Sequence, residues 1–377
     1  MENTGINYPN SDRSGLYNIM DRMGFAIVEV DITQPLHPID TPEGSAGVAL
    51  LVRDHEKPIG FVLLESAGCR AISDETLNRA ILSEVGPTLL ANRLRDEINP
   101  PITNVTLPPL TIAICTKDRP RLLSRCLSSL LAARFPSMGS LGEALRQDGG
   151  ECELLIIDNA PTDARTQEIV EQTTCARYVC EPIAGLNFAR NRAVSEAKGF
   201  LVAFLDDDTV VDPYWAIGLA NAISTYPRAG GFTGNVLPFE LQTQAQVIFE
   251  ASGGFGRGFS RIHFGPRLLG NRLYPCGAGI FGAGCNMAFR RDLILELGGF
   301  DEALDTGRPL PGGGDLDMFY RVVRSGNSIV YEPTFLVFHQ HRRQLAELRR
   351  QYESWGRGFM AYVSKSMNTD PEMRSIF

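Results

Sequence analysis

The stretch FLVAFLDDD, residues 200–208, decides the fold. Its first six residues are continuously apolar and include aromatic and β-branched members, a pattern typical of a strand buried on both faces of a parallel sheet. In open α/β sheets, ligands bind in the crevice beyond the carboxyl ends of the strands. The carboxylates of Asp206, Asp207 and Asp208 therefore stand where a ligand is expected.

These three adjacent carboxylates repel one another and are costly to keep ionised near a core. A divalent cation or the hydroxyls of a ligand would offset this repulsion, so the triplet indicates a metal site. The alternative is a solvated acidic turn ahead of Pro213, because Asp is also common in turns and at helix N-caps. The neighbouring motifs favour the metal site.

The composition is that of a soluble globular protein, with 377 residues, 44% of them hydrophobic and 21% charged. A net charge of −8 argues against general binding to nucleic acid, which depends on a surplus of Lys and Arg. Eight cysteines without a CxxC pair, and no signal-peptide pattern, predict free thiols in the cytoplasm. No apolar stretch reaches the roughly 18 to 20 residues of a membrane span, and peripheral contact with the inner face of the membrane stays open.

The chain is expected to divide into five segments. Residues 1–18 are polar and predict a flexible leader, and residues 19–100 predict a small α+β accessory module. Residues 101–109 form a Pro-rich linker. Residues 110–343 are expected to form the main domain, followed by a C-terminal helical extension at 344–377.

In the accessory module we expect one strand at residues 25–30 and a hairpin made of residues 48–53 and 59–64. Ser73 is the expected N-cap of a first helix, and a second helix covers residues 89–98.

The main domain alternates strands and helices with short connections, which predicts a parallel sheet with helices on both faces. The expected strands of its first half are residues 110–115, 152–157, 178–180 and 200–205. Two of these strands end in Asp, as in a nucleotide-binding half-sheet. No G-x-G-x-x-G follows the first strand, so the usual dinucleotide fingerprint is absent from the sequence.

Short motifs follow one another along this domain: IAICTKDR at 112–119, IIDN at 156–159, GLNFARN at 185–191, LDDD at 205–208, GAGCNMAFR at 282–290, GGFDE at 298–302 and GGGDLDM at 312–318. In this order they resemble the family 2 glycosyltransferases of GT-A fold, over about residues 110–343. The resemblance implies an α/β fold, in which a mostly parallel sheet is flanked by helices and carries the small N-terminal α+β module beside it.

The resemblance also implies a reaction. A sugar would pass with inversion from a nucleoside diphosphate sugar to an acceptor hydroxyl, assisted by Mn²⁺ or Mg²⁺. The expected donor carries UDP or dTDP rather than GDP, and the acceptor would be a glycan, a lipid or a small molecule.

For the metal and the diphosphate, the resemblance implies roles for residues of two segments. Asp208 is the expected metal ligand of the triplet, with Asp206 and Asp207 on the donor side. A His after the last strand can complete the metal shell, which selects His339. The next residues of that segment, His341 and Arg342, are expected to contact the diphosphate.

The donor nucleotide is expected to lie against the first strands. Asp158 could accept from the imide N–H of uracil or thymine, with Thr116 and Arg119 as the other wall. Helix capping is the alternative for Asp158. For Arg190 and Asn191, contact with the nucleotide and pairing with the acidic run both remain open.

Asp315 is the expected general base, because a carboxylate at a helix N-terminus is favoured in its ionised form. The family usually has Glu-Asp here, whereas this chain has Gly314-Asp315, so Asp317 remains a second candidate. The alternatives are an N-cap role for Asp315 and an i,i+4 ion pair between Asp317 and Arg321.

Two other functions stay open at this stage. A noncatalytic sugar-nucleotide or carbohydrate-binding protein would keep the crevice and lack a working base, and the Gly at position 314 is compatible with that. A nucleotidyltransferase would favour a Gly-rich loop with a basic residue after the first strand, which TKDRP at 116–120 does not resemble.

Overall fold

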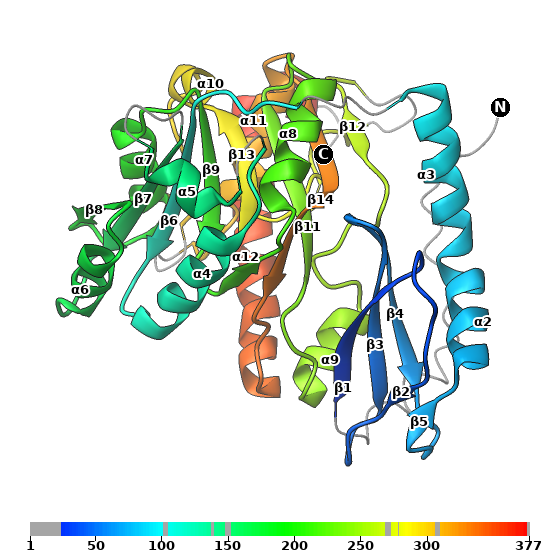
Figure 1. Cartoon of the computed structure of the whole chain (residues 1–377). Coiled ribbons are helices and arrows are strands. Elements are labelled where there is room, and N and C mark those ends of the chain that lie inside the picture. The colour runs from blue at the N-terminus through cyan, green and yellow to red at the C-terminus, as the bar shows by residue number, and fades with distance from the viewer. Residues whose placement is uncertain are drawn as a thin grey trace.

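The computed structural model describes residues 24–100, 105–136, 139–147, 152–267, 273–277, 279–305 and 310–374. The expected leader at residues 1–18 lies outside this part of the chain. Figure 1 shows a large sheet between helices and, beside it, a smaller N-terminal sheet in blue.

One half of the main sheet is parallel. Its strands are β6 (Leu110–Thr116), β7 (Cys152–Asn159), β8 (Ala176–Glu181) and β9 (Leu201–Asp206). They lie in the order β9-β6-β7-β8, and each neighbouring pair is parallel. The side chains of β6 and β9 are almost wholly buried, as their apolar runs predict. The predicted parallel sheet is confirmed in this half.

Beyond β9 the sheet becomes mixed. The added strands are β10 (Thr209–Val211), β11 (Gly231–Pro238), β12 (Ile262–Phe264), β13 (Asn286–Arg290) and β14 (Ile329–His339). β13 lies antiparallel between β9 and β11, β14 runs parallel to β11, and β10 and β12 pair antiparallel with β14. The last strand extends to His339, which pairs with Thr209 directly after the acidic triplet.

Helices cover both faces of the main sheet (Figure 1). One face is covered by α4 (Pro120–Ala132), α5 (Leu141–Leu145), α6 (Arg165–Gln172) and α8 (Trp215–Thr225), and the other by α7 (Leu186–Glu196), α10 (Arg291–Glu296) and α11 (Gly314–Arg324). Each group buries its apolar stripe in a separate core cluster, so the sheet is closed to water on both sides.

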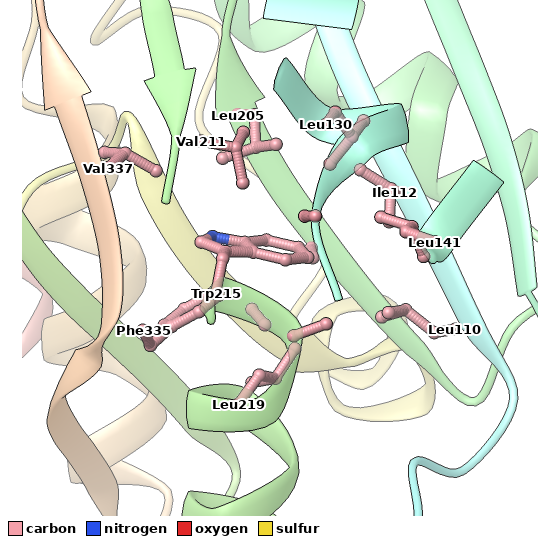
Figure 2. Close-up of a cluster of buried hydrophobic side chains, with 14 of the residues drawn as sticks. Leu110, Ile112, Leu130, Leu141, Leu205, Val211, Trp215, Leu219, Phe335 and Val337 are labelled. Atoms are coloured by element: carbon pink, nitrogen blue, oxygen red, sulfur yellow. The ribbon is translucent and has the colours of Figure 1, made fainter. Parts of the chain in front are cut away.

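Trp215 is the largest fully buried side chain of the described residues. Figure 2 shows its indole among Leu130, Leu205 and Phe335, between helix and strand. Its Nε1–H donates to Oδ1 of Asn286 at 3.0 Å. A buried donor is costly to leave unpaired, so this bond fixes the position of α8 against β13.

The N-terminal module matches its predicted elements. β3 (Gly47–Asp54) and β4 (Lys57–Glu65) form the expected hairpin, and β1 (Phe25–Asp31) pairs in parallel with β3. The helices are α2 (Asp74–Glu84) and α3 (Gly86–Ile98). The short strands β2 (Ile39–Asp40) and β5 (Ala71–Ile72) complete the module. Ser73 accepts from the Thr76 N–H and caps α2 as predicted.

This module packs directly on the main domain. Phe25 forms a β-bridge with Leu241, and its backbone N–H donates to the Leu241 carbonyl at 2.6 Å. Val247 of α9 (Gln244–Ala251) lies in the same apolar cluster as these two residues. The contact therefore holds the segment that leads into α9.

A buried ion pair joins the same two parts of the chain. Arg53 of β3 pairs with Asp212, and the side chains are 3% and 0% exposed. The Arg53 guanidinium also lies 2.9 Å from Glu29, and Asp212 accepts the N–H of Tyr214. Both charges are thus compensated inside the interface.

Of the expected linker, residues 105–109 are described. Leu107 is buried, and the carbonyl of Pro109 accepts the N–H of Leu201 at 3.0 Å. This part of the segment lies along the edge of the main domain.

The C-terminal residues form α12 (Leu345–Thr369) and α13 (Pro371–Arg374). α12 contacts α9 and α11, and its Lys365 pairs with Asp301 and Asp317. The predicted helical extension is therefore packed against the main domain.

All eight cysteines are free thiols, as predicted. Burial raises the pKa of Cys126 to about 12, so this thiol stays protonated and packs as a small apolar side chain. Within the described ranges, no helix combines the length and the apolarity needed to cross a bilayer.

Replacing Arg53 by Ala is expected to lower the free energy of unfolding by about 3–5 kcal/mol, because Asp212 is left buried without its cation. Guanidinium denaturation followed by tryptophan fluorescence measures the loss. The matched control is Arg79→Ala, whose pair with Glu75 is 76% and 82% exposed, and which should cost less than about 0.5 kcal/mol. Equal stability of the two variants would contradict the structural role of the buried pair.

Candidate active site

The acidic triplet lies at one edge of the main sheet. Asp206 ends β9 and pairs in register with Cys115 of β6, while Thr116 pairs with Asp158 of β7. Because these strands are parallel, their carboxyl ends place Thr116, Asp158 and the triplet along one edge of the sheet. Asp207 and Asp208 are 3% and 6% exposed, which excludes the alternative of a solvated turn.

Asp207 is bound by the loop that follows β6. The Thr116 hydroxyl donates to its Oδ2 at 2.7 Å, and Nη1 of Arg119 donates to its Oδ1 at 3.1 Å. Burial raises the pKa of Asp207 to about 6, against the charge of Arg119. Thr116 and Arg119 thus contact the acidic triplet and form one side of this site.

Asp208 faces His339 from the end of β14. Nε2 of His339 lies 3.3 Å from its Oδ1, and Nη1 of Arg119 lies 3.5 Å from its Oδ2. Burial alone would raise the pKa of Asp208, but the charges of His339 and Arg119 hold it below its usual value. Burial alone would lower the pKa of His339, and the nearby Asp208 raises it. The two expected metal ligands therefore meet.

His341 does not lie where it was expected. Its side chain is 1% exposed and is covered by the rings of Phe249 and Phe255, at centroid distances of 4.7 and 5.7 Å. Its Nδ1 lies 3.2 Å from Nδ1 of His339, and burial lowers its pKa. The expected diphosphate contact is wrong for His341, because the ring is enclosed behind His339. Arg342 is exposed, and its charge acts on Asp208.

The helix after Gly185 brings in one buried cation. Arg190 is 5% exposed; its Nη2 donates to the carbonyl of Gly284 at 3.3 Å and lies 4.0 Å from Oδ1 of Asp206. Of the two alternatives for Arg190, the structure shows the pairing with the acidic run.

Asn191 has a different role from the one expected. Its Nδ2 donates to the Phe300 carbonyl at 2.9 Å, and its Oδ1 accepts the Phe300 N–H at 2.7 Å. Both ends of the amide bind the backbone of Phe300, and Nδ2 also contacts Glu302, which does not favour the expected donor contact. The residue fixes the turn at 298–300 instead.

Asp158 is fully buried at the end of β7. The Tyr178 hydroxyl donates to its Oδ2 at 3.0 Å, and its Oδ1 has no hydrogen-bond partner among the described residues. Burial raises its pKa. Helix capping is excluded as its role, because α6 begins at Arg165 after Ala164 and receives no side-chain cap.

Asp315 and Asp317 differ in their surroundings, although both lie in the first turn of α11. The Gly284 N–H donates to Oδ2 of Asp315 at 3.1 Å, and a side chain at position 284 would collide with both Asp315 and Arg190. Asp317 is 1% exposed and pairs with Arg321 and Lys365, each at 2.7 Å. Gly313, in the left-handed conformation, is the N-cap, so capping is not the role of Asp315.

Sequence reasoning missed several residues that build the site. Asp305 is 1% exposed and accepts the Asn187 N–H at 2.9 Å, under the Gly185 turn. The residues Gly185-Leu186-Asn187 were the available sequence signal. Gly185 has a φ of 145°, and a side chain at this position would collide with Asp305. Glu250 of α9, 3.4 Å from His341, carries no local signal.

A metal would be held by few protein ligands here. In the part of the chain that the structure describes, no group of three or more His, Cys, Asp and Glu side chains is arranged to hold an ion. One carboxylate and one imidazole meet at Asp208 and His339, as a hard cation that also binds phosphate oxygens requires.

Residues 111–298 match glycosyl transferase family 2. The chain belongs to this family. Two relatives of this glycosyltransferase are named for O-antigen and succinoglycan biosynthesis. It is 26% identical over 350 residues to the O-antigen biosynthesis protein RfbC of Myxococcus xanthus, which covers 90% of this chain and 25% of the relative. It is 25% identical over 259 residues to the succinoglycan biosynthesis protein ExoM of Rhizobium meliloti, covering 65% and 72%. The chain thus spans only a quarter of the length of the first relative.

Solved structures show that the family 2 glycosyltransferase has the predicted fold. The mannosyltransferase PcManGT from Pyrobaculum calidifontis superimposes with a TM-score of 0.50 at 18% sequence identity, over 80% of this chain and 78% of that one. The GT-A fold inferred from the motifs is confirmed, and family membership sets aside the nucleotidyltransferase and the noncatalytic binder.

Replacing Asn191 by Ala is expected to lower the free energy of unfolding by about 1–3 kcal/mol, because the Phe300 backbone loses both partners. Binding of UDP or GDP should stay within about twofold of the wild type, measured by calorimetry with Mn²⁺ present. As control, Asn78→Ala removes one exposed bond to the Asp74 carbonyl and should leave both quantities unchanged. Loss of nucleotide binding with an unchanged free energy of unfolding would show that Asn191 contacts the donor.

Proposed function

We propose that this family 2 glycosyltransferase moves a sugar, with inversion and with the help of a divalent metal, from a nucleoside diphosphate sugar to an acceptor hydroxyl. The observation that carries the proposal is the meeting of Asp208 and His339 at the sheet edge, 3.3 Å apart. Neither residue is near the other in sequence, and both are largely buried. Such a pair of hard-cation ligands suits Mn²⁺ or Mg²⁺.

The fit of a metal rests on one unsatisfied atom. Oδ1 of Asp208 is buried and accepts no hydrogen bond from the described residues. Asp208 and His339 would hold the ion, with Asp206 beside them, and diphosphate oxygens and water would complete its shell. When bound, it would supply charge neutralisation for the departing diphosphate.

The cations around the triplet suit the same donor. Arg119 is 44% exposed in its side chain and touches Asp207 and Asp208, so its guanidinium can turn toward a phosphate. Arg342 is exposed on the other side of Asp208 and is proposed as a second diphosphate contact. Arg190 stays with Asp206 and holds that carboxylate in place.

Asp158 is proposed to recognise the base. Its free Oδ1 can accept the imide N–H of uracil or thymine, while Tyr178 holds the other oxygen. Adenine has no ring N–H on its pairing edge and offers only its exocyclic N6–H₂ group as a donor. PcManGT was solved with GDP-Man and Mn²⁺, which supports a nucleotide sugar and a metal for this chain as well.

Asp315 is proposed as the general base of a single displacement. The acceptor oxygen would form its bond to the anomeric carbon as the bond to the diphosphate oxygen breaks, and the hydroxyl proton would pass to Asp315. The Gly284 backbone holds this carboxylate beside Arg190, which in turn reaches Asp206. Asp317 is not favoured as the base, since Arg321 and Lys365 occupy its carboxylate.

The acceptor class is proposed from the relatives. Two of them are named for O-antigen and succinoglycan biosynthesis, so a growing glycan is favoured over a small molecule.

Replacing Asp208 by Ala is expected to abolish metal-dependent nucleotide binding. A thermal-shift panel of UDP, dTDP and GDP with and without Mn²⁺ should stabilise the wild type only with metal, and should not stabilise the variant. Asp74→Ala, at an exposed helix start, is the control and should behave as the wild type. Absence of any shift with the wild type would refute the nucleotide-metal site.

Replacing Asp315 by Asn is expected to lower kcat by about 10²–10⁴-fold and to leave nucleotide affinity unchanged, because the base is lost and the donor site is not. Release of the nucleoside diphosphate from the donors that pass the binding panel, with and without acceptor glycans, measures kcat. The control Asp317→Asn should lower stability more than kcat, since it leaves Arg321 and Lys365 without their buried partner. The reverse pattern would make Asp317 the base.

A further inference from the structure

A chain of four side chains leads from the acidic triplet into the interior. Oδ1 of Asp208 lies 3.3 Å from Nε2 of His339, Nδ1 of His339 lies 3.2 Å from Nδ1 of His341, and Nε2 of His341 lies 3.4 Å from Oε2 of Glu250. Every nitrogen of the two imidazoles thus faces one of the other three side chains.

The inner part of this chain is closed to solvent. The side chain of His341 is 1% exposed and that of Glu250 is 13% exposed. Phe249 packs its ring against His341, and Phe255 packs against both imidazoles. Nε2 of His341 and Oε2 of Glu250 have no hydrogen-bond partner in the described part of the chain, and they lie 3.4 Å from each other.

The contact between the two Nδ1 atoms holds one hydrogen. Two N–H groups would collide there, and two lone pairs would repel each other. A neutral imidazole carries one N–H and one lone pair, so the hydrogen belongs either to His339 or to His341. The choice fixes what the outer nitrogen of each ring presents.

Asp208 and Glu250 favour opposite arrangements, and a cation at Nε2 of His339 decides between them. If His341 held the hydrogen at Nδ1, the lone pair of its Nε2 would face the carboxylate of Glu250, and both are acceptors. If His339 holds it, Nε2–H of His341 donates to Glu250 and Nδ1 of His341 accepts from His339. The first arrangement gives Asp208 the Nε2–H of His339 and leaves Glu250 without a donor. The second gives Glu250 its donor and leaves the lone pair of Nε2 of His339 facing Asp208, so it satisfies both carboxylates only when a cation lies between His339 and Asp208.

We propose that Glu250 is a positioning residue that acts through His341 to keep the proton of His339 on Nδ1, so that Nε2 of His339 faces Asp208 as a metal ligand. This inference rests on the metal of the proposed function. Partners behind a ligating His commonly fix its tautomer and its ring orientation. Here the partner is a second His, and the carboxylate comes from helix α9.

Glu250 is itself held tightly. A side chain at Gly254, whose φ is 48°, would come within 2.5 Å of Oε2 of Glu250. α9 begins at a capping box between Thr243 and Gln246, and Val247 packs in the cluster of the N-terminal module. The carboxylate is therefore placed by rigid elements, as a positioning role requires.

The first test measures Mn²⁺ affinity from the electron paramagnetic resonance signal of free Mn²⁺, without nucleotide. Glu250→Ala is expected to weaken binding by about 10–100-fold, and Glu250→Gln less, because its amide can support either tautomer. The matched control is Glu240→Gln, a nearby acid that contacts Gln246, Gln340 and Arg343 but no imidazole, and that should bind as the wild type. Wild-type affinity in both Glu250 variants would overturn the proposal.

The second test reads the tautomers in the wild type saturated with Mg²⁺, which is diamagnetic, and needs no variant to fold. Long-range ¹H–¹⁵N spectra of ¹⁵N-histidine-labelled protein, with the five His assigned by single substitutions, should show His341 protonated at Nε2 and His339 protonated at Nδ1. A hydrogen on Nδ1 of His341 would overturn the proposal. A wild type that binds no Mn²⁺ would overturn the metal site itself. This outcome differs from a failure of the Glu250 proposal alone, because Asp208→Ala would then leave Mn²⁺ binding unchanged.

Discussion

The parallel pairing of β6, β7 and β9 is the constraint on which the rest of the structure depends. It brings the carboxyl ends of the strands to one edge, and with them Thr116, Asp158 and the carboxylates of 206–208. The strands are buried on both faces, so these polar groups cannot turn toward bulk water along the sheet. The cationic side chains at the site compensate the negative charge of the carboxylates at this sheet edge.

This compensation comes from distant parts of the chain. Arg119 follows β6, Arg190 lies in α7, and His339 ends β14, and each reaches one of the three carboxylates. Burial of these carboxylates disfavours their ionised form, and the nearby cations offset this desolvation only in part, because the pKa of Asp207 is still raised.

The N-terminal module has a structural connection to this chemistry. Its strands hold the segment that begins at Leu241 and continues into α9, through apolar contacts and through the buried pair of Arg53 and Asp212. α9 in turn carries Glu250, behind the two imidazoles. The module therefore lies against the elements that support the site, although it supplies none of the residues at the sheet edge.

The sequence by itself predicted the four parallel strands of the main sheet, the hairpin and helices of the N-terminal module and the edge at which the carboxylates lie, because hydrophobic period and strand-end motifs are local signals. The GT-A fold followed from the resemblance of its motifs to the family. The prediction that Asp208 and His339 share one site is matched by their distance of 3.3 Å. Only the tertiary structure decided that His341 is enclosed, that Asn191 serves the backbone of Phe300, and that Lys365 joins Arg321 at the carboxylate of Asp317. These outcomes depend on Phe249, on the turn at 298–300 and on α12, which lie far away in sequence. A side chain's role is set by the partners that surround it, and no local pattern records which distant partners the fold will bring.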